Sequence, residues 1–483
     1  MAVSLTTRRD VTLEAFRLVA REGQGVVIAP DALAVMDRCA DSFAALVRAR
    51  VEADPAALIY GVTTAPGDGA AVVLDAERQA RRPTRLWTAM SYGEPLPERV
   101  VRGILLARLA NLLEGHAAAR AELALAIAGM LDDGALPLVP AQGNGGAGEI
   151  LALGCLFFDL SARMELTPKE RMALINGSPC AAALVADLAL AGRERIELAE
   201  SVFALSSDVI GAPDDAYSAD LEPLWDDEHE TAALGALRAL LAGSPGPRQR
   251  HQAPVSFRIL PRVLGAARRA QAAAERAATI SLQSVTDNPV YIPPDADRPL
   301  GTVFSTGGYH NAQAPAAMDG VASAWADLCQ LAERHTDQLF QHPATAPLLS
   351  ADEWTVKPLH HAQNWWAEEA RSLAQPTLLS LAGFGQNDVP ALSFLAWRKA
   401  TAIGVCLDGA LAALAGVASQ ALHVAGRGAG SRLDALVAEI HGQFPPVTAQ
   451  VRPVGRDCQA LMDAFTRRAH GEAVSGEPPA GEP

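Results

Sequence analysis

The sequence predicts a mainly α-helical protein, in which a long central bundle of antiparallel helices is joined to a smaller N-terminal mixed segment. Two observations support this fold class. Hydrophobic residues make up 49% of the 483 residues but aromatic residues only 5%, and alanine and leucine dominate. Strands favour β-branched and aromatic side chains instead. Apolar residues also recur at i, i+3, i+4 and i+7 over long runs, as in helices that bury one face.

Three segments are expected along the chain. The mixed N-terminal segment covers residues 1–205 and contains two glycine-rich turns, at 61–69 and 143–148. The helix bundle covers residues 206–470, because long helices joined by short loops pack in this way. Residues 471–483 are rich in Gly, Pro and Glu, a composition that predicts a disordered tail.

The periodic runs of the second segment cover about 232–285 and 311–425. Residues 402–426 form the longest apolar stretch, but Asp408, Ser419 and Gln420 interrupt it. We therefore interpret this stretch as a central helix of the bundle, and we expect no membrane partner.

Charge and cysteine content exclude several classes of function. The net charge of −15 disfavours binding to a nucleic-acid backbone, which requires a basic face. The six cysteines are scattered without metal-ligand or disulfide-framework spacing, and the N-terminus lacks the apolar core of a signal peptide. We expect a cytoplasmic protein with no metal. The acidic run 226–230 is interpreted as a solvated loop, because no second cluster of metal ligands accompanies it.

Eight short motifs follow one another in a fixed order between residues 60 and 389. They are Tyr60–Thr64, Gly93–Leu96, Pro137–Pro140, Ala173–Ser178, Gln252–Arg258, Ser284–Pro289, Gly307–His310 and Gln386–Val389. Together they resemble the histidine/phenylalanine ammonia-lyase family of aromatic amino acid lyases. The resemblance extends over nearly the whole chain, and it implies a homotetramer in which three subunits build each active site.

The resemblance implies a catalytic role for three residues. Tyr60 takes the place of the general base on a mobile loop, close to positive helix ends that would favour the phenolate. Asn176 corresponds to the asparagine that hydrogen-bonds the prosthetic group, although it is also placed to hold a helix start. Tyr309 stands at an aromatic position, where it either donates a hydrogen bond or packs.

Six further residues are candidates for substrate binding. Arg258 matches the arginine that binds the substrate carboxylate, with an ion pair between subunits as the alternative. The pair His360–His361 offers a base near neutral pH, although a packing or surface pair is the simpler interpretation. The remaining candidates are Thr88 at the ring-selectivity position, Gln252, and Asn387 where the family has Glu or Gln.

The prosthetic-group segment departs from the family. The lyases form a methylidene-imidazolone from an Ala-Ser-Gly triad, in which the serine supplies the methylene carbon. Here the turn is degenerate: Gly146, Ala147 and Gly148 stand in its place, with Ala147 at the serine position. No Ser, Thr or Cys lies between Pro140 and Gly154. We therefore expect no methylidene-imidazolone and no other cofactor.

These features predict an enzyme that needs no prosthetic group and acts on a small, already activated carboxylate. Acid–base elimination, its reverse addition, isomerisation and cyclisation all fit the surviving residues. Two alternatives stay open: a non-catalytic binding or assembly homologue, and ammonia elimination by an unforeseen route.

Overall fold

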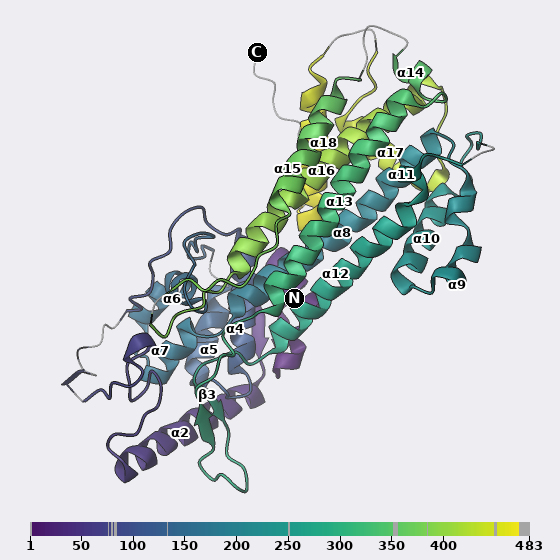
Figure 1. Cartoon of the computed structure of the whole chain (residues 1–483). Coiled ribbons are helices and arrows are strands. Elements are labelled where there is room, and N and C mark those ends of the chain that lie inside the picture. Colours follow the sequence, from purple (N-terminus) through teal and green to yellow (C-terminus); the bar gives the residue numbers. More distant parts are fainter. Residues whose placement is uncertain are drawn as a thin grey trace. The chain divides into compact units, whose positions relative to one another are not determined.

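A computed structural model (Figure 1) provides the structure of the protein. It describes residues 2–75, 77–78, 81, 85–132, 134–249, 252–350, 356–383, 385–448 and 452–472. Helices predominate, and the described residues form only two small sheets, so the predicted fold class is confirmed. Of the predicted disordered tail, residues 473–483 lie outside the described part of the chain.

The chain divides into two compact units, and each draws on segments that are far apart in the sequence. Unit 1 comprises Met1–Leu188, Ala274–Met318 and Pro376–Arg398, and unit 2 comprises Ala189–Ala273, Asp319–Gln375 and Lys399–Pro483. The division predicted at residue 205 follows chain order alone, whereas the contacts group residues by neighbourhood in space.

Unit 1 combines the long helix α2 and several shorter helices with the two sheets. Its helices are α1 (Leu13–Phe16), α2 (Pro30–Ala53), α4 (Glu98–Leu112), α5 (Ala121–Met130), α6 (Ile150–Arg163) and α7 (Pro168–Ile175). Strands β1 (Val3–Leu5) and β2 (Val26–Ile28) pair in parallel, with Val3 opposite Val26. Strands β3 (Val290–Ile292) and β4 (Thr302–Phe304) pair antiparallel, with Val290 opposite Phe304.

Helix α4 lies at the centre of unit 1. Every residue of α4 from Val100 to Leu112 is buried, including Arg102 and Arg108. Arg102 is satisfied by three backbone carbonyls, those of Val19, Gln24 and Leu131. A charged side chain can occupy such a position because each donor finds an acceptor without water.

Unit 2 holds the helix bundle. Its helices are α9 (Glu222–Trp225), α10 (Glu228–Leu241), α11 (Val255–Arg258), α14 (Ala346–Ser350), α15 (Leu359–Leu373), α17 (Asp434–Gln443) and α18 (Val454–His470). Four long helices contribute residues to both units: α8 (Pro179–Val209), α12 (Leu260–Gln283), α13 (Gln313–Gln341) and α16 (Ser393–Val424).

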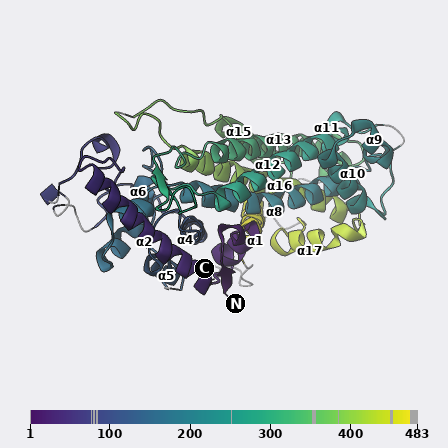
Figure 2. The ribbon, with the colours of Figure 1, turned by 90° about the horizontal axis from the view of Figure 1, so that it is seen from below.

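Side-chain pairs within unit 2 show which helices are neighbours and, for one pair of helices, how they run. Gln271 of α12 reaches Ala189 of α8, and Arg268 reaches Glu200, so these two helices are antiparallel. Gln330 of α13 donates to Ala367 of α15, the next long helix along the chain. Figures 1 and 2 both show α13 and α15 side by side. Helices that follow one another in the chain therefore pack against each other, as the predicted bundle requires.

Two apolar helical stretches, Pro168–Val209 and Ser393–Val424, are long enough to cross a membrane by length and composition. Their most apolar windows are 100% and 83% buried inside the structure. A core helix passes the same test, so these stretches are weak evidence for a membrane span.

Candidate active site

Residues 60–67, called the Tyr60 loop, begin the site in unit 1. Gly61 has a positive φ of 67°, and a Cβ atom there would lie 2.6 Å from the Met172 side chain. Glycine is therefore required for both backbone and space. The loop closes on itself, because the Gly67 amide donates a hydrogen bond of 2.9 Å to the Tyr60 hydroxyl. This bond fixes the direction in which Tyr60 presents its oxygen.

Burial of the Tyr60 ring raises the pKa of its hydroxyl above the usual value of a tyrosine. The hydrogen bond from Gly67 lowers this pKa, and the nearby Tyr309 raises it further, so the net direction is upward. Burial within this chain thus opposes the expected phenolate. Tyr60 presents a neutral phenol that can donate a proton.

The glycine-rich turn 143–148 leads directly into α6. Gly143 and Gly148 both have positive φ, and a Cβ at Gly148 would lie 3.3 Å from Cδ2 of Tyr309. The Gly146 carbonyl accepts a hydrogen bond of 2.9 Å from the Ala391 amide. The side chain of Glu149, the residue before α6, makes no capping hydrogen bond to that helix. The end of the turn at Gly148 therefore lies against the Tyr309 ring.

Asn387 also belongs to this neighbourhood. A Cβ at Gly67 would lie 3.5 Å from the Asn387 side-chain nitrogen. The adjacent Gln386 amide donates to the Asp68 carboxylate at 2.8 Å. The Tyr60 loop and the segment that carries Asn387 are thus held together within one chain.

Asn176 ends α7 and is buried. Its side-chain oxygen accepts a hydrogen bond of 3.2 Å from the Gly177 amide, and its carbonyl oxygen accepts one from the Arg108 guanidinium. These contacts fix the turn between α7 and α8. They support the alternative interpretation of Asn176, in which it holds the start of a helix.

Two buried charged residues near the turn were missed by sequence reasoning, namely Glu149 and Arg108. The Glu149 carboxyl accepts hydrogen bonds of 2.6 Å from the amides of Cys180 and Ala181, at the start of α8. Burial raises the pKa of Glu149 to about 7, although these hydrogen bonds and the Arg108 charge act in the opposite direction. Glu149 thereby ties the glycine-rich turn to the helix that follows Asn176. A signal was available, since both charges interrupt apolar runs.

Thr88 is buried, with 3% of its surface exposed, and packs against α6. A Cβ at Gly154 would lie 2.5 Å from its hydroxyl oxygen. Among the described residues this hydroxyl has no hydrogen-bond partner. It lines a pocket together with Gly61 and Met172, so Thr88 lies beside the Tyr60 loop as the resemblance implies.

Arg258 and Gln252 lie in unit 2. The Arg258 Nε donates to the Ala253 carbonyl at 2.9 Å, and the side chain is half-buried. Within the described parts of this chain no carboxylate lies at ion-pair distance from Arg258. Gln252 is exposed. The guanidinium therefore keeps donors for a carboxylate, from a ligand or from another subunit.

His335 holds the segment that carries Arg258. Its ring stacks on Phe257 with 3.7 Å between centroids, and its Nε2 lies 3.1 Å from the Ser256 carbonyl oxygen. Burial lowers the pKa of His335 to about 3, so the ring is neutral. Nε2 then donates to Ser256, and Nδ1 accepts from the Ser206 hydroxyl at 2.8 Å. This neutral tautomer anchors α11.

His360 and His361 differ in their surroundings. The His360 Nε2 lies 3.1 Å from the Glu333 carboxylate and 3.8 Å from that of Asp337. His361 is exposed. The packing and surface interpretation fits both contacts, because His360 already has carboxylate partners.

Unit 1 thus brings together most of the predicted site residues, and unit 2 holds the others. Those of unit 1 are Tyr60, Thr88, Gly146, Ala147, Gly148, Asn176, Tyr309 and Asn387, and those of unit 2 are Gln252, Arg258, His360 and His361. In the described residues, no three His, Cys, Asp or Glu side chains gather as a metal site.

Comparison with known proteins identifies a protein family and individual proteins that this chain resembles. A model of the aromatic amino acid lyase family matches residues 11–162 and 159–442. Histidine ammonia-lyase of Deinococcus radiodurans is 32% identical over 372 residues, which cover 70% of this chain and 69% of that protein.

Solved structures share the fold over nearly the whole chain. Tyrosine aminomutase of Streptomyces globisporus matches with a TM-score of 0.84 at 23% identity, covering 97% of this chain and 98% of that one. Ergothionase of Treponema denticola, an ergothioneine-degrading enzyme, matches with a TM-score of 0.85 at 19% identity. That match covers 97% of this chain and 99% of the other.

Proposed function

Since this chain belongs to the aromatic amino acid lyase family, we propose that it is a lyase- or isomerase-type enzyme that works without a methylidene-imidazolone. Its substrate is a small carboxylate whose reacting proton or leaving group is already activated. The reaction class is acid–base elimination or addition, isomerisation, or cyclisation.

The observation that carries this proposal is the residue at position 147. The prosthetic group requires a β-hydroxyl that leaves as water, and Ala147 has none. The residues of the turn therefore do not fit the group. Val255 departs further. The resemblance of the segment Gln252–Arg258 implies a tyrosine at this position that helps to position the group, and valine has no hydroxyl.

The remaining residues support proton transfer on a bound carboxylate. Tyr60 moves the proton, and a positioned acid or base contributes about 10²–10⁴-fold in rate. Arg258 orients the substrate carboxylate through its planar fork of donors. The amide groups of the glycine-rich turn, with Asn176, stabilise the charge that develops. An activated substrate is required because these contributions do not replace a covalent electrophile.

We also propose that the protein is a cytoplasmic homotetramer. Support comes from the family resemblance, which implies that three subunits build each active site. Tyr60 and Asn387 already lie near each other within one chain, so the residue that the assembly would have to bring to them is Arg258. Light scattering of the purified protein is expected to give four times the mass of one chain. A monomer at micromolar concentration would contradict an inherited active site.

Borohydride treatment tests the proposal directly. A methylidene-imidazolone is an electrophile and is reduced irreversibly, whereas a chain without one offers borohydride nothing to reduce. We expect unchanged turnover after treatment and removal of the reagent. Loss of activity would return ammonia-lyase chemistry to consideration.

A further inference from the structure

A second pocket of unit 1 lies between the glycine-rich turn and the N-terminal end of α16. Residues 141–145 line one side, and residues of the segment 391–398 line the other. The Ala391 amide donates to the Gly146 carbonyl at 2.9 Å, so the two sides are held together. The pocket has a volume of about 210 Å³. One water needs only about 10–15 Å³, so the pocket has room for a small molecule.

The side of the pocket at α16 is mainly apolar. Ala391, Leu392, Phe394 and Leu395 line it. Leu395 is 47% exposed, although covering an apolar side chain is favourable. These residues also mark the start of a long helix, whose first amide groups have no partner within the helix and carry partial positive charge. This side therefore suits a molecule that has an apolar body and a negatively charged group.

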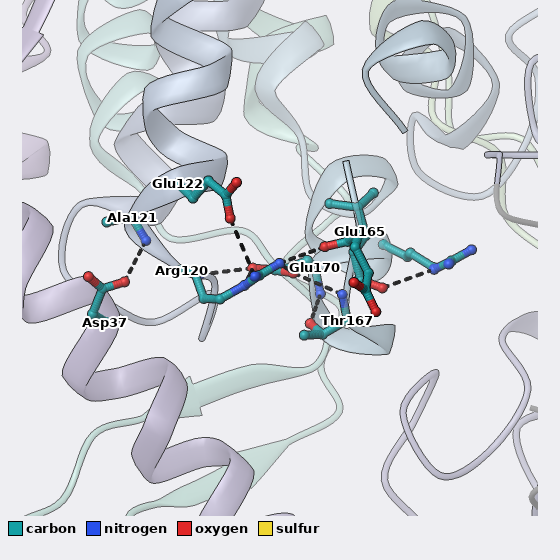
Figure 3. Close-up of polar contacts among 9 residues, drawn as sticks. Asp37, Arg120, Ala121, Glu122, Glu165, Thr167 and Glu170 are labelled. Carbon is teal, nitrogen blue, oxygen red and sulfur yellow. Dashed lines mark hydrogen bonds and ion pairs between the residues drawn. The ribbon is translucent and has the colours of Figure 1, made fainter. Parts of the chain in front are cut away.

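Arg398 adds a full positive charge to the same side. Its side chain is exposed, and within the described residues its guanidinium has no hydrogen-bond or ion-pair partner. Arg120 of the same unit shows the opposite arrangement. Figure 3 shows its guanidinium with two carboxylates, those of Glu170 at 2.9 Å and Glu122 at 3.4 Å. None of the residues that line the pocket is acidic, so the charge of Arg398 is available to a bound anion.

The side formed by the turn is open and polar. A Cβ atom at Gly145 would meet no atom within 4 Å. Its neighbour Asn144 is only 9% exposed. The Asn144 Nδ2 donates to the Pro140 carbonyl at 2.8 Å, whereas its Oδ1 has no hydrogen-bond partner among the described residues. A buried amide oxygen costs free energy until water or a ligand donor satisfies it. This oxygen is a second, independent indication that the pocket takes up a polar molecule.

We propose that this pocket is a second binding site, which takes a small carboxylate with an apolar body. The carboxylate pairs with the Arg398 guanidinium at the start of α16, and the apolar body covers Leu392 and Leu395. A phosphate ion would use the charge but leave the apolar side uncovered, and a hydrocarbon would leave the guanidinium unpaired. The inference does not rest on the proposed function, in which the carboxylate is held by Arg258.

Calorimetric titration of the full-length protein with three acids and their neutral amides tests the inference. The pairs are benzoate and benzamide, 3-phenylpropanoate and 3-phenylpropanamide, and hexanoate and hexanamide. The titrations use the Arg258→Gln variant, so that Arg258 does not contribute, and are repeated without that change. At least one acid is expected to bind at least about tenfold more tightly than its amide, because a hydrogen-bonded charge pair is worth about one such factor. Equal binding of acid and amide in all three pairs would overturn the inference.

Two substitutions locate the effect at this pocket. Arg398→Gln is expected to lower the affinity for the acid about tenfold, to that of its amide, and to leave the affinity for the amide unchanged. Leu395→Asp supplies an internal carboxylate three residues before Arg398, on the same face of the helix, and is expected to have the same result. Both positions are exposed, and an acidic residue is favourable in the first turn of a helix, so the fold is kept.

Leu395→Asn is the matched control, because asparagine has the size of aspartate without its charge. It is expected to keep the preference for the acid. Equal affinities for the acid in Leu395→Asp and Leu395→Asn, or an affinity that Arg398→Gln leaves unchanged, would contradict the assignment. If Arg258→Gln does not fold, the two Leu395 variants in the otherwise unchanged chain decide, since both retain Arg258. The proposed function is judged by turnover and stands or falls separately.

Discussion

Tyr60→Phe is expected to lower turnover of the substrate by about 10²–10⁴-fold, the contribution of a positioned acid or base. The change removes only the hydroxyl, which accepts the hydrogen bond from Gly67 at 2.9 Å. Phenylalanine fills the same space as tyrosine, so packing is kept. The loop loses one hydrogen bond, and the enzyme loses the hydroxyl that transfers the proton. Steady-state kinetics, with circular dichroism to confirm the fold, measure the effect.

The control for this variant is Tyr92→Phe, because Tyr92 lies in the same unit and is 80% exposed. Its replacement is expected to leave turnover unchanged. A rise in KM with unchanged kcat in the Tyr60 variant would assign Tyr60 to binding alone. Unchanged kcat and unchanged KM would remove it from the mechanism altogether.

Asp408→Ala is expected to destabilise the bundle by about 3–5 kcal/mol, the usual effect of breaking a buried ion pair. Asp408 of α16 receives two hydrogen bonds from Arg195 of α8, at 2.9 and 2.7 Å, and a third from Thr466 at 2.9 Å. The two charged side chains are 0% and 1% exposed. Alanine leaves the Arg195 guanidinium buried without its counter-charge, above the ring of Trp325.

Urea denaturation followed by circular dichroism measures this loss as a shift of the unfolding midpoint. The surface pair Arg371–Glu368, in the same unit, supplies the control, and Glu368→Ala is expected to cause a much smaller shift. The double variant Arg195→Leu with Asp408→Ala removes both charges. The double variant is expected to recover part of the stability that Asp408→Ala loses. A double variant less stable than Asp408→Ala would contradict a purely electrostatic origin of that loss.

The fold was largely predictable from sequence because helical periodicity records which face of each helix is buried. The stripes in α12 and α13 predicted two of the long bundle helices directly. Periodicity does not record how segments group in space. The chain joins residues 274–318 and 376–398 to the N-terminal unit, and only long-range contacts reveal this.

The candidate site was predictable where a motif carried it and not elsewhere. Tyr60, Tyr309 and Asn387 gather in unit 1, whereas the resemblance implied that Tyr60 and Asn387 come together only between subunits. The protonation of Tyr60 was not predictable, because it depends on how deeply the ring is buried. Arg108 and Glu149 were missed for a related reason: their role comes from partners that lie 31 to 68 residues away in the sequence.

The charged residues of α7 illustrate the same limit. Lys169, Glu170 and Arg171 are consecutive, and the sequence alone does not show which of them lines the pocket beside the Tyr60 loop. Helix geometry turns neighbouring side chains by about 100° from one another. Lys169 pairs with Asp287, and Glu170 pairs with Arg120. Arg171, the next residue, lines the pocket.

The absence of the prosthetic group is the central claim, and the intact mass of the purified protein tests it most directly. Formation of a methylidene-imidazolone removes two waters from the chain, whereas Ala147 has no hydroxyl to lose. We predict a mass equal to that of the unmodified sequence, and tryptic peptides spanning residues 143–148 without dehydration. A mass short by two waters, localised to that turn, would contradict the account.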